Sequence, residues 1–187
     1  MTYASEVAAD TPWGYWKFDD ASGSTATDSS GNSRHLTLSG TYTRNVTGIS
    51  SLLGAATQVG TDVYAEATSA PGSPMATAWT VECWYKPSNW SGGAAKGIFQ
   101  TGSSFVTNDG VWSIRHSDTS FLEGQIQVVR NDGGGASMVL AAPWKALTNG
   151  MPQHLVITYD GSSALRIYRN GLVIASTTGV GAASPGT

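Results

Sequence analysis

A run of alternating apolar residues, interrupted by two turn sequences, occupies residues 154–176, HLVITYDGSSALRIYRNGLVIAS. Apolar side chains at every second position are typical of β-strands with one buried face. Asn170-Gly171 supplies the two positive-φ residues of a type I′ hairpin turn, and Asp160-Gly161 marks the other turn. The stretch therefore predicts three consecutive antiparallel strands, His154–Tyr159, Leu165–Arg169 and Leu172–Ser176.

The same signals predict strands over most of the remaining chain. The segments, separated by polar, glycine-rich or proline-bearing breaks, are Trp13–Asp19, His35–Leu38, Ala55–Val59, Val63–Ala67, Thr80–Lys86, Gly97–Thr101, Val111–His116, Glu123–Arg130 and Ser137–Ala141. We expect a short helix or turn over Tyr3–Asp10 and a long polar loop over residues 20–33. Many short strands with so little helix predict an all-β fold, a two-sheet antiparallel jelly-roll β-sandwich.

Length and composition suit this fold. The chain has 187 residues, enough for one sizeable core, and we expect a lead-in over residues 1–12 followed by one domain over residues 13–187. Charged residues make up 12% of the chain, about half of the roughly 25% usual for soluble domains. Its 23 glycines, with many serines and threonines, favour strands joined by tight turns.

The charge and the cysteine content exclude several classes of function. A net charge of −3 without a basic run argues against a nucleic-acid partner. No stretch approaches the ~20 apolar residues of a membrane-spanning helix, so we expect no membrane insertion. The single cysteine, Cys83, rules out an intrachain disulfide and is expected to be a buried thiol. The start of the chain lacks the features of a signal peptide, which predicts synthesis in the cytosol if Met1 is the native start.

Four motifs resemble those of the laminin-G-like, concanavalin A-like jelly-roll domains. They are the aromatic run Tyr15–Asp20, the loop Asp28–Asn32 (DSSGN), the strand Trp79–Pro87 (WTVECWYKP) and the hairpin pair His154–Gly171. The resemblance spans about Trp13 to Ser176 and implies two packed antiparallel sheets, often a calcium ion near the rim, and roles in glycan or protein binding. The family's closing strands are not found before Thr187. We therefore expect them either in a longer polypeptide or replaced by a neighbouring subunit, because uncovered edges are a liability.

The acidic residues argue against catalysis. Glycosidases need two carboxylates about 5–10 Å apart across the scissile bond. The four glutamates, Glu6, Glu66, Glu82 and Glu123, form no E-x-D-x-E signature, and Asp19 and Asp20 would point to opposite faces of a strand. The histidines, His35, His116 and His154, are far apart in the sequence. We expect no enzyme and no zinc site.

Calcium is the metal that the sequence could accommodate. The loop Asp28–Asn32 offers a carboxylate, an amide oxygen and a glycine, and Asp19 or Asp20 could approach from the preceding segment. Such oxygens are the ligands that Ca²⁺ prefers. The candidate ligands are therefore Asp28, Asn32, Asp19 and Asp20. The alternative is that Asp28 and Asn32 only form Asx-type turns.

Aromatic residues in polar loops are the candidates for glycan contacts, because sugars present C–H patches and hydroxyls together. Trp90 lies in a glycine-rich loop, and Trp144 and Trp112 follow turn sequences. Asn131 and Asp132 form a second possible rim contact. The alternative is that these tryptophans cap the sandwich and that the Asn131-Asp132 loop only provides hairpin flexibility. Trp16, Trp79 and Trp84, in predicted strands, are expected to be buried.

These observations predict a non-catalytic binding module. The low-charge, Ser/Thr/Gly-rich composition resembles that of such domains in bacteriophage virion proteins, particularly minor tail proteins, which are made in the host cytosol and act outside the cell. The expected partner is a host cell-surface glycan. The alternatives are a structural virion component that contacts neighbouring subunits, in which case an oligomer is possible, and a carbohydrate-binding module of a secreted or cell-surface bacterial protein.

Overall fold

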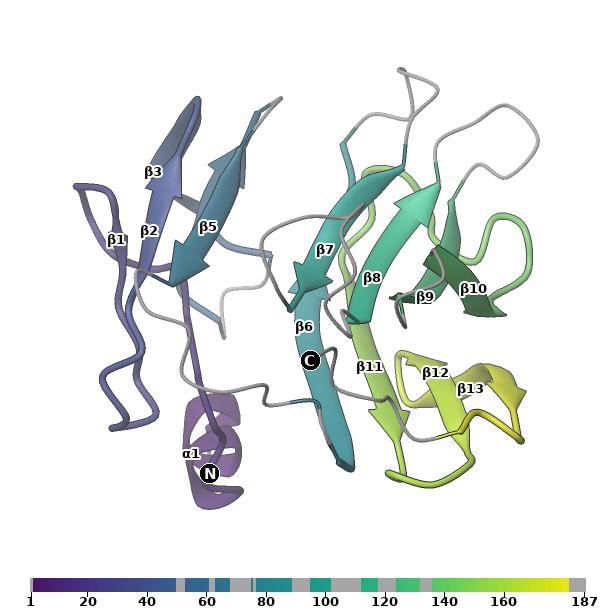
Figure 1. Ribbon diagram of the computed structural model, residues 1–187. Helices are drawn as coiled ribbons and strands as arrows, with labels where there is room; N and C mark the ends of the chain where they lie inside the picture. The colour runs from purple at the N-terminus through teal and green to yellow at the C-terminus, as the bar shows by residue number, and fades with distance from the viewer. Residues whose placement is uncertain are drawn as a thin grey trace. The chain divides into compact units, whose positions relative to one another are not determined.

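The computed structural model describes residues 2–49, 53–60, 63–67, 75, 77–88, 95–101, 112–117, 124–131 and 136–181 (Figure 1). The chain divides into two compact units, Met1–Pro71 and Gly72–Thr187. This division does not test the expected lead-in over residues 1–12 or the single domain over residues 13–187, and both stay predictions.

The first unit begins with the helix α1, Tyr3–Ala9, which confirms the predicted helix or turn. Thr2 caps it, because the Thr2 hydroxyl accepts a hydrogen bond from the Ser5 backbone N–H at 3.2 Å and the Ser5 hydroxyl returns one to the Thr2 carbonyl at 2.7 Å. Among the described residues no helix is long and apolar enough to cross a membrane.

The described part of the first unit continues with five short strands. Strands β1 (Thr25–Ala26), β2 (Leu36–Ser39) and β5 (Tyr64–Ala67) form one antiparallel sheet in the order β1-β2-β5, and β3 (Tyr42–Thr47) pairs with β4 (Ala55–Val59). Three of the predicted strands are confirmed here, at β2, β4 and β5. The strand β3 was missed because its sequence, YTRNVT, has few apolar residues to set a period.

The predicted strand over Trp13–Asp19 is wrong. This segment forms only an isolated bridge between Trp16 and Asp28, and none of its side chains is buried. Phe18 has a φ of 56°, a left-handed conformation that interrupts an extended chain. The predicted loop over residues 20–33 is correct apart from the two-residue strand β1.

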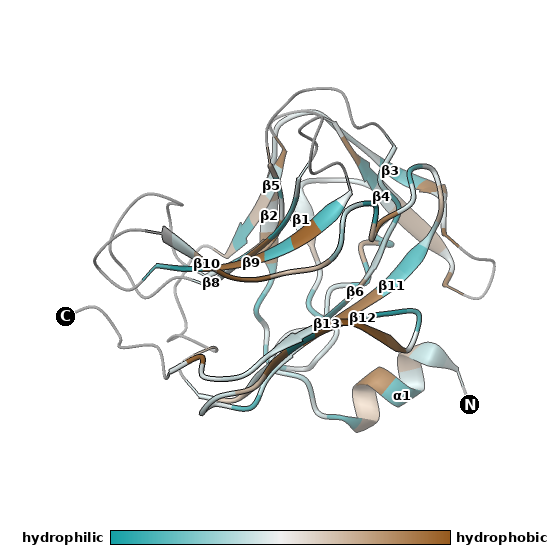
Figure 2. Ribbon diagram, turned by 90° about the vertical axis from the view of Figure 1, so that its right-hand side faces the viewer, coloured by the Kyte–Doolittle hydropathy of each residue, from teal (hydrophilic) through white to brown (hydrophobic). Residues whose placement is uncertain are grey.

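In the residues that the structure describes, the second unit forms two four-stranded antiparallel sheets. Their strands are β6 (Trp79–Tyr85), β7 (Lys96–Gln100), β8 (Trp112–Ser117), β9 (Gln125–Asn131), β10 (Ala136–Ala141), β11 (Gln153–Tyr159), β12 (Leu165–Arg169) and β13 (Leu172–Thr177). One sheet has the order β10-β9-β8-β7 and the other β13-β12-β11-β6. Figure 2 shows β8–β10 and β11–β13 in two layers. The expected all-β sandwich is confirmed.

The core of this unit lies between the two sheets. Trp112, Ile114, Ile126 and Val128 come from one sheet, and Leu155, Ile157, Leu165 and Ile167 come from the other; each is fully buried. At one point of the core the ring of Trp112 packs 5.0 Å from that of Trp79 and 5.2 Å from that of Tyr159, and so joins the layers. The expected burial of Trp79 is confirmed, whereas Trp16 is only half-buried.

The meander β11-β12-β13 matches its prediction closely. Asn170 and Gly171 have φ values of 50° and 80°, as a type I′ turn requires. In the other turn, the Asp160 carboxylate accepts hydrogen bonds from the backbone N–H groups of Ser162, Ser163 and Ala164, which lower its pKa from 3.8 to about 2. β13 and β6 are the edges of this sheet in the described chain. That a longer chain or a neighbouring subunit supplies closing strands stays a prediction.

Candidate functional site

Asp28 opens the loop that was predicted to bind calcium, and its carboxylate is occupied by protein donors. The residue is 7% exposed. Its Oδ1 accepts hydrogen bonds from the backbone N–H groups of Tyr15 and Ser30, both at 2.9 Å. Its Oδ2 accepts from the Ser30 hydroxyl and the Arg34 backbone N–H, both at 2.8 Å. The carboxylate thus ties its own loop to the segment around Tyr15.

The hydrogen bonds also decide the ionisation of Asp28. Burial raises the pKa of this carboxyl group, but the bonds from Tyr15, Ser30 and Arg34 outweigh it and bring the pKa down from 3.8 to about 2. The group is therefore charged throughout the neutral range. A buried carboxylate with four donors is stable without a metal ion, as in an Asx-type turn.

Asn32, at the other end of the loop, also joins segments of the chain. Its amide Nδ2 donates to the backbone carbonyls of Pro12 at 3.2 Å and Trp13 at 3.1 Å. The same segment is held by Arg34, whose Nη1 donates to the Trp13 carbonyl at 2.7 Å and whose guanidinium lies 4.2 Å from the centre of the Trp13 ring. Gly31, with a φ of 89°, allows the turn between the two ends of the loop.

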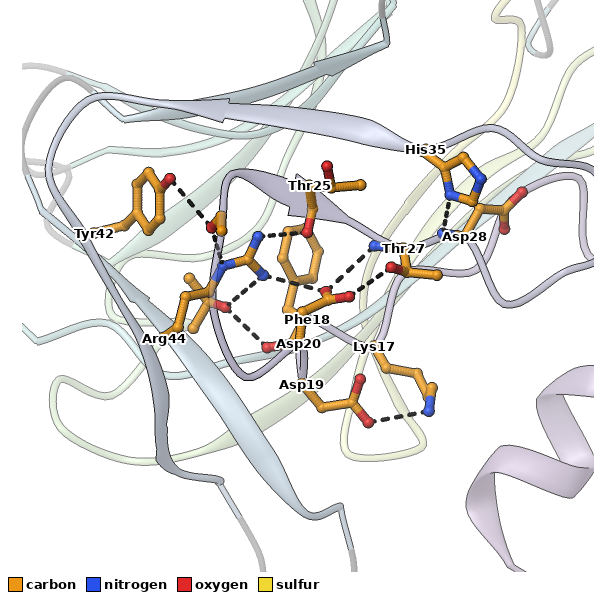
Figure 3. Close-up of polar contacts among 12 residues, drawn as sticks. Lys17, Phe18, Asp19, Asp20, Thr25, Thr27, Asp28, His35, Tyr42 and Arg44 are labelled. Carbon is orange, nitrogen blue, oxygen red and sulfur yellow. Dashed lines mark hydrogen bonds and ion pairs between the residues drawn. The ribbon is translucent and has the colours of Figure 1, made fainter.

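Asp19 and Asp20 point to different partners, as Figure 3 shows. Asp19 forms a surface ion pair with Lys17 at 3.0 Å. Asp20 accepts hydrogen bonds from the Thr27 hydroxyl at 2.5 Å and the Thr27 N–H at 3.3 Å, and pairs with Arg44 at 3.2 Å. Burial raises the pKa of Asp20, but the Thr27 hydrogen bonds and the Arg44 charge lower it below 3.8 overall.

The four predicted ligands therefore do not fit a calcium ion in this arrangement. Within the described ranges no group of three or more His, Cys, Asp or Glu side chains could hold a metal. A calcium ion needs six to eight oxygens directed at one point. Here Asp28 is saturated by N–H and O–H donors, Asp19 faces Lys17, and the cation beside Asp20 is Arg44.

Two of the predicted glycan contacts are buried. Trp112 is fully buried, because the alternation of β8 places it on the face toward the core. Asn131, the last residue of β9, is 3% exposed. The prediction of surface contacts is wrong for both residues. Trp90 and Asp132 lie outside the described residues.

Trp144, by contrast, projects from the surface of the second unit. It is 55% exposed and sits in a turn closed by a hydrogen bond from the Ala146 N–H to the Pro143 carbonyl at 3.1 Å. Lys145 follows with a φ of 57°, a strained conformation for a residue other than glycine. The Lys145 ammonium lies 4.4 Å from the centre of the Trp144 ring, within the range of a cation–π contact.

The residues on both sides of Trp144 anchor this turn. Ala142, Ala146 and Leu147 are buried in the core of the second unit. The Ala142 and Leu147 N–H groups donate to carbonyls on and beside β9, each at 2.8 Å, and Arg169 donates to the Ala146 carbonyl. The turn therefore presents an exposed aromatic ring on a fixed support, which lowers the entropic cost of binding.

A second aromatic cluster lies on the outer side of β6 and β11, and sequence reasoning missed it. Trp84 was expected to be buried but is 38% exposed. Its ring lies 5.0 Å from that of His154, whose Nε2 is 2.8 Å from Glu82 Oε1. Glu82 and Trp84 are two positions apart in one strand and share a face. The charge at Glu82 was the sequence signal that marks this face as the outer one.

This cluster does not provide the acid pair of a glycosidase. Thr80 and Trp84 flank Glu82 on the same face of β6, and Val156 lies opposite it on β11. None of these positions carries a second carboxylate. The acid present, Glu82, is paired with His154.

The sequence comparison agrees with the fold. Residues 59–187 match the laminin G-like family model of the concanavalin A-like lectin/glucanases superfamily. The chain belongs to this family. The match includes every strand of the second unit and begins at the last residue of β4 in the first. None of the curated proteins matches the chain. Membership indicates a carbohydrate- or protein-binding module.

Proposed function

We propose that this protein is a non-catalytic module that binds glycans through the turn carrying Trp144. The observation that carries the proposal is an indole ring, 55% exposed, on a turn whose neighbours Ala142, Ala146 and Leu147 are buried. Sugar rings bind to such aromatic faces through their C–H groups, while nearby polar groups fix their orientation. Lys145 and the backbone of the turn supply polar groups beside the ring.

We also propose a setting for this module, namely a bacteriophage virion, where it would attach to host cell-surface glycans outside the cell. The support is compositional. Few residues are charged, glycine is abundant, and one cysteine imposes no need for an oxidising compartment during folding.

Glycan binding by a Trp144→Ala variant tests the function. Wild type is applied to an array of bacterial envelope glycans, and hits are quantified by calorimetry. Trp144→Ala is expected to weaken binding about 5- to 150-fold, taking for the stacked ring the loss of about 1–3 kcal/mol that an aromatic side chain stacked on a nucleic-acid base contributes. Met151→Ala is the matched control, because Met151 is 56% exposed in the segment that follows the turn. It should bind like wild type.

Three outcomes would count against the proposal. They are the absence of any glycan hit at millimolar concentration, equal binding by wild type and Trp144→Ala, and release of reducing sugar from a bound polysaccharide. Trp90→Ala in the same array tests the other loop tryptophan singled out by the sequence. A loss confined to Trp90→Ala would place the glycan there and not at Trp144.

A second candidate function is contact with neighbouring protein subunits. Two apolar residues at the start of β13, Leu172 and Val173, are 72% and 54% exposed directly after the Asn170-Gly171 turn. Exposed apolar side chains of this kind favour protein contacts. If they form such a contact, wild type self-associates in light scattering and the double variant Leu172→Ser, Val173→Thr does not. A wild type that stays monomeric at high concentration would argue against self-assembly through this turn.

A further inference from the structure

The guanidinium of Arg44 is held by oxygen atoms from two segments of the first unit, residues 20–25 and strand β4 (Figure 3). Its Nε donates to the Gly23 carbonyl at 3.2 Å and its Nη2 to the Thr25 carbonyl at 2.6 Å. Its Nη1 donates to Asp20 Oδ2 at 3.2 Å and to Thr57 Oγ1 at 3.4 Å. We call these four oxygens, from Asp20, Gly23, Thr25 and Thr57, the oxygen cradle.

The charged groups of the cradle are mostly covered and balance each other in charge. The side chain of Arg44 is 6% exposed and that of Asp20 is 19% exposed. The other acid nearby in the chain, Asp19, is paired with Lys17. The ring of Tyr42 lies 5.6 Å from the guanidinium, and the Tyr42 hydroxyl donates to the Gly23 carbonyl at 3.4 Å. One positive and one negative charge therefore meet within the cradle and attract each other there.

The backbone is adjusted to bring Arg44 into the cradle. In the pairing of β3 with β4, Thr43 faces Gln58 and Val46 faces Ala56, so Arg44 and Asn45 together stand opposite Thr57. Such a β-bulge redirects a side chain out of the regular alternation. Asn45 has a φ of 55° within the bulge. On the other side of the cradle, strained Phe18 offers its carbonyl to the Thr57 hydroxyl at 2.8 Å.

The chemistry of the cradle is that of a site for a hard cation. A carboxylate, two backbone carbonyls and a hydroxyl are the kinds of oxygen that surround calcium. The observed distances, 2.6–3.4 Å, are those of N–H···O hydrogen bonds and not of the 2.3–2.6 Å contacts of a calcium ion. The planar guanidinium, with its five N–H donors, provides the hydrogen bonds that these oxygens accept, in place of a metal ion.

We propose that Arg44 is the resident cation of this loop cluster, so that the first unit keeps its loops in place without calcium. The positive charge that stabilises the cluster is supplied by the chain itself. The structure of this unit is then independent of calcium and of chelators. Removal of the Arg44 side chain leaves an oxygen-lined vacancy for a small cation, with free guanidinium as the best fit.

The test is rescue of an Arg44→Ala variant by guanidinium. Thermal unfolding is followed by circular dichroism in EGTA, with guanidinium chloride added at millimolar, non-denaturing concentrations. The melting temperature of Arg44→Ala should rise by about 3–6 °C at a guanidinium concentration of about ten times its Kd, and then with the logarithm of the concentration. Equal sodium chloride should have no such effect. Wild type and the double variant Asp20→Asn, Arg44→Ala should not respond to guanidinium. A folded Arg44→Ala that ignores guanidinium would overturn the proposal.

A measurement on the wild-type protein decides the matter even if Arg44→Ala fails to fold. In ¹⁵N NMR spectra, a guanidinium fixed by four oxygens gives a slowly exchanging Nε–H and resolved Nη resonances. We expect both features for Arg44 and no change in them, or in the melting temperature, on addition of millimolar calcium. Averaged Arg44 resonances like those of a free arginine, or displacement of them by calcium, would show that Arg44 is not the resident cation.

Discussion

Replacing Asp28 with asparagine is expected to destabilise the protein by about 2 kcal/mol at neutral pH. The buried carboxylate accepts four hydrogen bonds, from Tyr15, Arg34 and twice from Ser30. Asparagine keeps one acceptor oxygen but places an N–H₂ group against donors. The substitution therefore leaves buried donors without their charged acceptor.

The magnitude follows from the pKa of Asp28. The folded-state pKa, about 2, is below the 3.8 of an ordinary aspartate. Since each unit of pKa corresponds to about 1.4 kcal/mol, this pKa difference corresponds to a stabilisation of the folded state by about 2 kcal/mol. Because the folded pKa is lowered, the stabilisation is fully present above pH 3.8 and is lost as the pH falls through about 2. The difference in unfolding free energy between wild type and Asp28→Asn should therefore disappear as the pH falls from about 4 to about 2.

Urea unfolding of both proteins, followed by circular dichroism from pH 7 down to pH 2, measures this gap. Asp19→Asn is the control, because Asp19 forms only an exposed pair with Lys17. It should stay within about 0.5 kcal/mol of wild type. The reasoning fails if Asp28→Asn is as stable as Asp19→Asn at pH 7, or if its deficit is the same at pH 2 as at pH 7.

Two further predictions concern the second unit. Trp112→Ala should lower the free energy of unfolding by about 3–5 kcal/mol, because the substitution leaves a cavity beside Trp79 and Tyr159. Trp144→Ala should change the free energy of unfolding by less than about 0.5 kcal/mol, because Trp144 is exposed. Equal losses of stability in thermal unfolding of the two variants would contradict the placement of the two rings. Cys83, expected to be a buried thiol, is partly buried against the core. Desolvation of the thiol, with a smaller contribution from the Glu82 charge, raises its pKa from 9.0 to about 12. Native protein should therefore resist a thiol reagent at pH 8 and react once unfolded, and rapid modification of the native protein would refute this.

Local signals in the sequence predicted the parts of the fold that depend on near neighbours in the chain. Alternation gave the strands of the meander, and Asn170-Gly171 gave its turn. Where alternation was absent, as in β3, the strand was missed. Over Trp13–Asp19 the alternating aromatic residues predicted a strand, but this segment forms only an isolated bridge and no strand. A strand forms only where another strand pairs with it, and the sequence of the segment alone does not show whether such a strand lies beside it.

The acidic residues show the same limit at the candidate site. The sequence correctly placed acids and turn formers in the segments 19–20 and 28–32, and it left open a choice between a calcium site and Asx turns. The tertiary structure shows which partners these carboxylates have: Arg44 pairs with Asp20 from 24 residues away, and the backbone N–H groups of Tyr15 and Arg34 donate to Asp28. Which donors meet a carboxylate depends on the folding of distant segments against each other.

By itself, then, the sequence determined that the chain is all-β and where most of its strands and turns lie. Only the tertiary structure decided which tryptophans are exposed. Trp112 is buried and Trp144 is not, although both follow turn sequences. The reason is that burial depends on which face of a strand or turn meets the opposite sheet, and this contact joins residues that are far apart in the chain.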